Sequence, residues 1–75
     1  MEELTYGEKA VDLQATKGNE LDIYVMKRRI ADVINQLHAE RSQSDNPEIK
    51  RMLSIVITDL QTAAMRATQA LTWKY

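Results

Sequence analysis

The stretch from Met52 to Met65 reads Met-Leu-Ser-Ile-Val-Ile-Thr-Asp-Leu-Gln-Thr-Ala-Ala-Met, and Asp59 is its only formally charged residue. A helix on the outside of a small monomer exposes a broad charged face to water. This stretch instead has apolar residues on nearly every side, interrupted by small polar groups. A chain of 75 residues is too short to cover such a helix by itself. We therefore expect the protein to form an oligomer.

The helix that contains this stretch is predicted to span residues 47–72. Pro47 suits the first helical position because it has no amide hydrogen and a fixed φ, and Asn46 suits the N-cap. One line of apolar residues follows the spacing of a coiled-coil seam and is expected to receive the other helix. Its members are Ile49, Leu53, Val56, Leu60, Ala63, Ala67 and Ala70. A second line, expected to meet other copies, consists of Ile57, Ala64, Thr68 and Leu71.

Another helix is predicted over residues 20–41. Asn19 suits its N-cap, and Glu20 and Asp22 place negative charge in the first turn, where the helix dipole favours it. Its apolar residues form a stripe at helical spacing: Ile23, Met26, Ile30, Val33, Ile34 and Leu37. The remaining surface is charged and is expected to face water, with the basic cluster Lys27, Arg28 and Arg29 on it.

The N-terminal residues 1–19 have weak periodicity and contain both glycines, which predicts an extended arm. The arm is expected to be anchored by Tyr6, Val11 and Leu13. Residues 42–46 form a turn, and a short connection between two long helices makes them antiparallel. The predicted fold is therefore all-α: a single domain, an antiparallel two-helix hairpin with an extended N-terminal arm, which assembles into an oligomer.

The composition excludes several classes of site and partner. There is no cysteine, and His38 is the only histidine, which argues against disulfides and against a protein-built zinc or haem site. We expect His38 to be a solvated surface residue. The net charge of −1, with both signs interspersed, argues against DNA or RNA as partners. No uncharged apolar run is long enough for a membrane span, and no signal peptide is apparent, so we expect a cytoplasmic protein.

No catalytic pattern is present, so we expect neither an enzyme nor a cofactor. The sequence lacks a glycine-rich phosphate loop and metal-ligand spacing. Ser54 and Thr58 lie one turn apart and share a face with Arg51. Their hydroxyls either bond to the carbonyl one turn earlier or line a polar pocket between copies. Tyr6 and Trp73 either pack the arm and tail or stack on a nucleobase.

Three parts of the chain resemble a known family. They are Leu4-Thr-Tyr-Gly-Glu-Lys-Ala-Val, the region around Lys27, and Ser54-Ile-Val-Ile-Thr-Asp-Leu-Gln-Thr-Ala-Ala-Met with the tail Ala70-Leu-Thr-Trp. These parts resemble the anti-CBASS and anti-Thoeris sponges, small helical-hairpin proteins of phages. Such proteins sequester the cyclic oligonucleotide or cyclic ADP-ribose signals of bacterial immunity without cleaving them. The chain is similar to the minimal anti-CBASS form, because it lacks the inserted strand segment of the cyclic ADP-ribose binders.

The resemblance implies a hexamer, built as a trimer of dimers, in the cytoplasm of an infected bacterium. It implies cyclic dinucleotide binding between paired protomers, with Tyr6 stacking on a base and Lys27 contacting the ligand. Arg28 is the alternative to Lys27, because the helix can be aligned one residue differently. The resemblance also implies cyclic trinucleotide binding on a threefold axis by Arg51 and Ser54, with Thr58 on the same face.

Two other functions remain open from the sequence. A structural or regulatory helical oligomer, or an adaptor without a small-molecule ligand, would explain the uncharged helix equally well, but it would assign no role to Tyr6 or Arg51. A small all-helical enzyme of the chorismate-mutase type would enclose an anionic substrate with Arg and Lys. Such an enzyme needs a third helix, which the sequence pattern does not predict.

Overall fold

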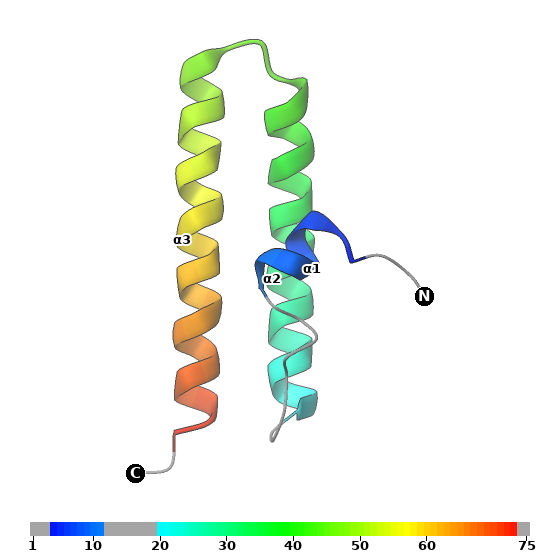
Figure 1. Ribbon diagram of the computed structural model, residues 1–75, viewed down its shortest axis with the longest axis vertical. Coiled ribbons are helices and arrows are strands. Elements are labelled where there is room, and N and C mark those ends of the chain that lie inside the picture. Colours follow the sequence, from blue (N-terminus) through cyan, green and yellow to red (C-terminus); the bar gives the residue numbers. More distant parts are fainter. Residues whose placement is uncertain (1–3, 12–19, 74–75) are drawn as a thin grey trace.

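A computed structural model describes residues 4–11 and 20–73 of the chain. These two segments contain helices α1 (Tyr6–Ala10), α2 (Glu20–Gln43) and α3 (Pro47–Leu71), and no strand. The predicted all-α class is confirmed. The long helices α2 and α3 lie side by side and run in opposite directions, and the short α1 lies across α2 (Figure 1). None of the helices in the described segments is long and apolar enough to cross a membrane.

Local signals define both ends of α3. The Asn46 side chain accepts hydrogen bonds from the Glu48 amide at 2.9 Å and the Ile49 amide at 3.4 Å, and Pro47 occupies the start of the helix. The Thr72 amide closes the C-terminal end by donating to the Thr68 carbonyl at 3.0 Å. The helix therefore ends one residue before the predicted end at position 72.

Helix α2 continues two residues beyond the predicted end at position 41. Arg41 lies in its last turn, where a cation interacts favourably with the negative end of the helix dipole. The predicted N-cap Asn19 and the predicted anchor Leu13 lie outside the described residues.

The prediction of an extended arm is wrong for residues 6–10, which form α1. A capping box starts this helix: the Thr5 hydroxyl accepts from the Glu8 amide at 3.2 Å, and the Glu8 carboxylate accepts from the Thr5 amide at 2.7 Å. Gly7 is buried against α2, and a Cβ at this position would lie 2.8 Å from the Ala31 carbonyl carbon. A helix this short has no apolar periodicity, so the sequence pattern could not predict it.

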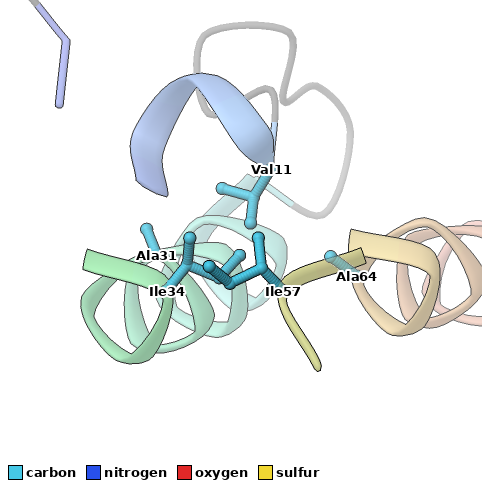
Figure 2. Close-up of a cluster of buried hydrophobic side chains, with 5 residues drawn as sticks. All are labelled: Val11, Ala31, Ile34, Ile57 and Ala64. Carbon is cyan, nitrogen blue, oxygen red and sulfur yellow. The ribbon is translucent and has the colours of Figure 1, made fainter. Parts of the chain in front are cut away.

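The core lies where all three helices meet (Figure 2). Val11 follows α1 and is buried, as the prediction of an anchor requires, and it packs over Ile34 of α2 and Ile57 of α3 (Figure 2). Ala31 and Ala64 complete this cluster. The small residues allow the helix backbones to approach closely.

The predicted roles of the two apolar lines of α3 are wrong in part, since Leu60 of the first line does pack against the core. The buried residues of α3 are Ile57 and Ala64, which the sequence had assigned to contacts with other copies. Ile49 and Val56, which were expected to receive the other helix, are 43% and 41% exposed. The physical reason is α1: because its end places Val11 over one side of the α2–α3 pair, the neighbouring side of α3 becomes the core.

Candidate functional site

The most organised group of polar side chains in the described residues surrounds Tyr6. The Tyr6 ring stacks on the His38 ring with 4.1 Å between the ring centroids and 5° between the planes. The guanidinium carbon of Arg41 lies 5.6 Å from the centre of the Tyr6 ring. His38 is therefore not the solvated surface residue expected from the sequence, because α1 brings Tyr6 onto it.

Arg41 connects all three helices. Its Nη1 donates to the Ser54 hydroxyl of α3 at 2.9 Å, and its Nη2 lies 2.9 Å from His38 Nδ1 and 3.4 Å from the Tyr6 hydroxyl. A guanidinium can only donate, so His38 Nδ1 accepts and the ring carries its proton on Nε2. We call these four residues, Tyr6, His38, Arg41 and Ser54, the Arg41 cluster.

Asn35 positions α1, and with it Tyr6. The Gly7 amide donates to Asn35 Oδ1 at 2.7 Å, and Asn35 Nδ2 donates to the Thr5 hydroxyl at 3.0 Å. Both bonds hold the first turn of α1 against the middle of α2. The stacking of Tyr6 on His38 follows from this docking, because Tyr6 is the first residue of α1.

An ion-pair network adds to this docking. Arg28 of α2 binds Glu8 of α1, and its Nη2 also donates to Asp32 at 2.8 Å. The hydrogen bond from the Thr5 amide, followed by that from Arg28, holds the pKa of Glu8 below its usual value. The same carboxylates raise the pKa of Arg28, with the Glu8 hydrogen bond as the larger cause. The Arg28 guanidinium, a predicted ligand contact, is therefore already engaged by two carboxylates in the single chain.

Lys27 lies on the buried side of α2, and the prediction that it faces water is wrong. It is 6% exposed, and Ala10 of α1 and the following Val11 lie around the same pocket. Its long aliphatic stem can be buried among apolar groups. Lys27 lines a pocket of about 270 Å³, together with Ala10, Val11, Ala64, Met65 and Thr68.

Tyr6 lines a different pocket, of about 250 Å³, with Lys9, Ala10 and Gln61. The two pockets have Ala10 in common, so they lie on either side of the end of α1. Lys27 precedes the stacking partner His38 by 11 residues, or about 16 Å along the helix axis. One chain therefore does not bring Tyr6 and Lys27 into a single pocket.

The predicted trinucleotide residues lie on one side of α3. Arg51 is exposed, and its Nε donates to Glu48 at 2.9 Å. The Thr58 hydroxyl donates to the Ser54 carbonyl one turn earlier at 3.1 Å, the first of the two alternatives considered for it. The Ser54 hydroxyl instead accepts from Arg41, which the sequence did not predict. Trp73 lies beyond the end of α3 and is exposed.

Sequence reasoning missed His38 and Arg41 as site residues. A signal was present in the spacing: Asn35, His38 and Arg41 recur every three residues, beside the apolar stripe of the same helix. Residues three apart lie on neighbouring positions of a helix surface. Here the polar line next to the apolar stripe lies on the side of α2 where α1 docks through hydrogen bonds.

A second surface lies on the opposite side of the α2–α3 pair. In α3, Met52 lies about 180° around the helix from Gln61, which donates to the Ala10 carbonyl at 3.3 Å. In α2, Met26 lies about 180° from Asn35, which binds α1. Apolar residues within about 60° of Met26 or Met52 on these helices form what we call the outer apolar face. Leaving out the buried Ile23, they are Met26, Ile30, Val33 and Leu37 of α2, and Ile49, Met52, Ile55, Val56, Ala63, Ala67 and Ala70 of α3.

Metal binding receives no support from the side chains described, because no three His, Cys, Asp or Glu residues among them could hold an ion together. The chemistry that the described sites offer is stacking, cation–anion contact and apolar docking. Comparison of the chain with protein families, curated proteins and solved structures finds no match. A functional assignment therefore depends on the sequence resemblance and on the geometry of these surfaces.

Proposed function

We propose that the chain assembles into an oligomer that binds and sequesters cyclic oligonucleotides without cleaving them. The observation that carries this proposal is the Tyr6 ring, which is 43% exposed, held flat against His38, and next to the guanidinium of Arg41. An exposed ring can stack on a nucleobase, and a neighbouring cation can bind a phosphate. Tyr6 is also the residue to which the resemblance assigns base stacking.

Pocket size supports binding between protomers. The Lys27 pocket has a volume of about 270 Å³, below the range of about 300–1,000 Å³ typical of sites for small molecules. A second protomer placed over this pocket would enlarge and close it. Such a partner could also bring its own Tyr6 towards Lys27, which one chain alone does not do. Arg28 could take part only if its contacts with Glu8 and Asp32 were exchanged for ligand contacts.

The outer apolar face supports assembly. Ile49, Met52 and Val56 each keep more than two-fifths of their surface exposed, and Val33 of α2 does the same. Contiguous apolar patches on a small protein mark interaction sites. We propose that other copies of the chain cover this face, with a hexamer built as a trimer of dimers as the assembly. We also propose that Arg51, Ser54 and Thr58, which lie on a different side of α3 from this face, converge on a threefold axis through a second contact between copies and bind a cyclic trinucleotide.

In this proposal the protein acts in the cytoplasm of an infected bacterium and blocks CBASS-type antiphage signalling. It acts as a stoichiometric trap, so it needs no catalytic residue. The amount of protein must then exceed the amount of signal, which a small chain made in many copies can achieve.

The test is recovery of intact ligand. Purified protein is incubated with cyclic di-AMP, cyclic di-GMP, cyclic GMP–AMP or cyclic tri-AMP, separated from free ligand, and heat-denatured. We expect at least one unaltered cyclic oligonucleotide in the released fraction by chromatography and mass spectrometry. A linear or otherwise altered product would indicate an enzyme. No retained ligand would favour the structural oligomer or adaptor.

The enzyme alternative finds little support in the fold. An enclosing third helix would have to be long, and α1 has five residues. The structural oligomer remains the second candidate, because the outer apolar face requires a partner but no ligand. That candidate gives no reason for the half-exposed Tyr6 ring beside Arg41, which is why sequestration is preferred.

A further inference from the structure

We propose that Arg41 is a phosphate-binding residue, with His38 as the residue that positions it. The phosphate belongs to a nucleotide whose base stacks on the free face of Tyr6. This inference rests on the proposed function for the class of ligand, but the resemblance assigns no role to Arg41 or His38.

The charge of Arg41 favours a bound anion. Arg41 is half-buried between three helices, and its hydrogen-bond partners are neutral: the Ser54 hydroxyl, His38 Nδ1 and the Tyr6 hydroxyl. Within the described part of the chain it has no carboxylate partner, whereas Arg28 binds two carboxylates and Arg51 binds one. Charged groups withdrawn from water are normally paired with an opposite charge. A ligand phosphate would supply the anion that the chain does not.

The arrangement of the Tyr6 and His38 rings favours a phosphate beside Arg41. His38 covers one face of the Tyr6 ring, and the ring also lines the pocket shared with Lys9, Ala10 and Gln61. A base entering that pocket would extend the histidine–tyrosine stack by one layer. Arg41 lies at the edge of the stack, because it contacts His38 Nδ1 and the Tyr6 hydroxyl. A phosphate attached to the stacked nucleoside would approach this edge, with exposed Lys9 as a second cation on the pocket wall.

The Arg41 side chain is also preorganised. Three helices hold the guanidinium in one place before any ligand arrives, since its Nη1 binds α3 and its Nη2 meets α2 and α1. A cation fixed in this way loses little side-chain freedom on binding. These contacts use three of the five guanidinium N–H groups, one on Nη1 and two on Nη2, so the Nε–H group and the second Nη1 N–H group remain for an incoming oxygen. His38 is a positioning residue here: it orients Arg41 and supports Tyr6, but does not itself contact the ligand.

The test compares Arg41→Gln and Arg41→Lys with Arg29→Gln, which alters an exposed arginine of the same helix. Binding of the best cyclic dinucleotide is measured by calorimetry, and the mass of the assembly by light scattering. We expect Arg41→Gln to weaken binding by about tenfold to a hundredfold, the loss of one charge-assisted contact. Arg41→Lys should recover part of the affinity, and Arg29→Gln should stay within about twofold of the wild type. Wild-type affinity in Arg41→Gln with unchanged assembly would overturn the proposal.

A second measurement separates this inference from the proposed function. Isotope-labelled wild-type protein is titrated with inorganic phosphate and with pyrophosphate while the arginine Nε–H signals are followed by NMR. A saturating shift at Arg41 and none at Arg29 would support the anion site, even if no cyclic oligonucleotide bound and the proposed function failed. Because this titration uses the wild-type protein, it tests the anion site even if Arg41→Gln does not fold. No selective shift at Arg41 would overturn the phosphate role.

The role of His38 is tested by His38→Gln and His38→Phe. The glutamine can still accept from Arg41, whereas phenylalanine can stack on Tyr6 but cannot accept. We expect His38→Phe to broaden or move the Arg41 Nε–H signal and to weaken phosphate binding, and His38→Gln to retain more of both. Equal phosphate binding in the two variants would show that His38 does not position Arg41.

Discussion

The two sides of the α2–α3 pair differ in the contacts that their side chains make within the chain. On the α1 side, side chains from three helices form hydrogen bonds, and Asn35, Arg28 and Arg41 each bind α1. On the opposite side, the outer apolar face has apolar residues of which several remain more than two-fifths exposed. One side is completed by contacts within the chain, whereas the other keeps apolar surface exposed, which we propose that a partner covers.

The largest effect should come from a charge in the core. Ile57→Glu places a carboxylate at a position that is 2% exposed and packed among three helices. An unpaired buried charge costs at least about 3 kcal/mol, a large part of the stability of a small domain. We expect the variant to lose its cooperative thermal transition by circular dichroism. A melting temperature close to that of the wild type would show that position 57 is not in the core.

The adjacent substitution Val56→Glu separates the two sides. Val56 lies on the outer apolar face, so its charge should disrupt contacts between copies and leave the packing of α1, α2 and α3 intact. We expect a smaller mass by light scattering with helix content retained by circular dichroism. The control is Gln69→Glu, which adds the same charge at an exposed polar position of α3. An assembly of unchanged mass in Val56→Glu would move the interface away from this face.

A smaller effect is expected from Gly7→Ala, which acts on the α1 side alone. The added methyl group would overlap the Ala31 carbonyl and approach Asn35 Oδ1 at 2.9 Å, and a backbone group cannot move aside. We expect α1 to detach, with a loss of about 1–3 kcal/mol.

The measurement for Gly7→Ala is the NMR shift of the His38 ring protons, which depends on stacking with Tyr6. We expect these shifts to approach those of an unstacked histidine and cyclic dinucleotide binding to fall, while the assembly keeps its mass. Lys9→Ala, an exposed position on α1, should leave the His38 shifts unchanged. Unaltered shifts in Gly7→Ala would mean that α1 tolerates the methyl group.

The smallest effect should be the pH dependence of the Glu8 contacts. Its pKa in the folded chain is lowered, chiefly by the Thr5 amide and then by Arg28. The resulting stabilisation is present above the unfolded pKa of about 4.3 and is lost as the pH falls through the folded pKa. Wild type and Glu8→Gln should therefore differ in melting temperature near neutral pH and converge in acid. A difference that does not depend on pH would assign the effect to packing instead.

Local sequence signals were sufficient for the long helices. Asn46 and Pro47 start α3 through bonds between near neighbours in the chain, so the start of that helix was predictable. The apolar spacing of α2 likewise identified its length to within two residues. Apolar spacing did not reveal α1, because a helix of five residues has too few positions for a periodic pattern.

The candidate site was less predictable than the helices. Tyr6 could be singled out as an aromatic residue outside the long helices, but its partners come from positions 38, 41 and 54. The three-residue spacing of positions 38 and 41 places them on one side of α2, but no periodicity connects them to position 54 or to Tyr6, because that proximity depends on how the helices pack. Lys27 was predicted to face water for the same reason, because its burial depends on residues packed beside α2, such as Ala10 and Val11, and not on the pattern of its own helix.

The amino-acid sequence alone determined that the chain is helical, where the two long helices lie, and that α3 has more apolar surface than one partner helix can cover. Only the tertiary structure decided which line of α3 enters the core, and it chose Ile57 and Ala64 over Ile49 and Val56. The physical reason is that helix formation depends on neighbours within a few residues, whereas burial depends on every element packed nearby. Here a single turn of helix, docked by Gly7 and Asn35, selects the buried side and brings Tyr6 to Arg41.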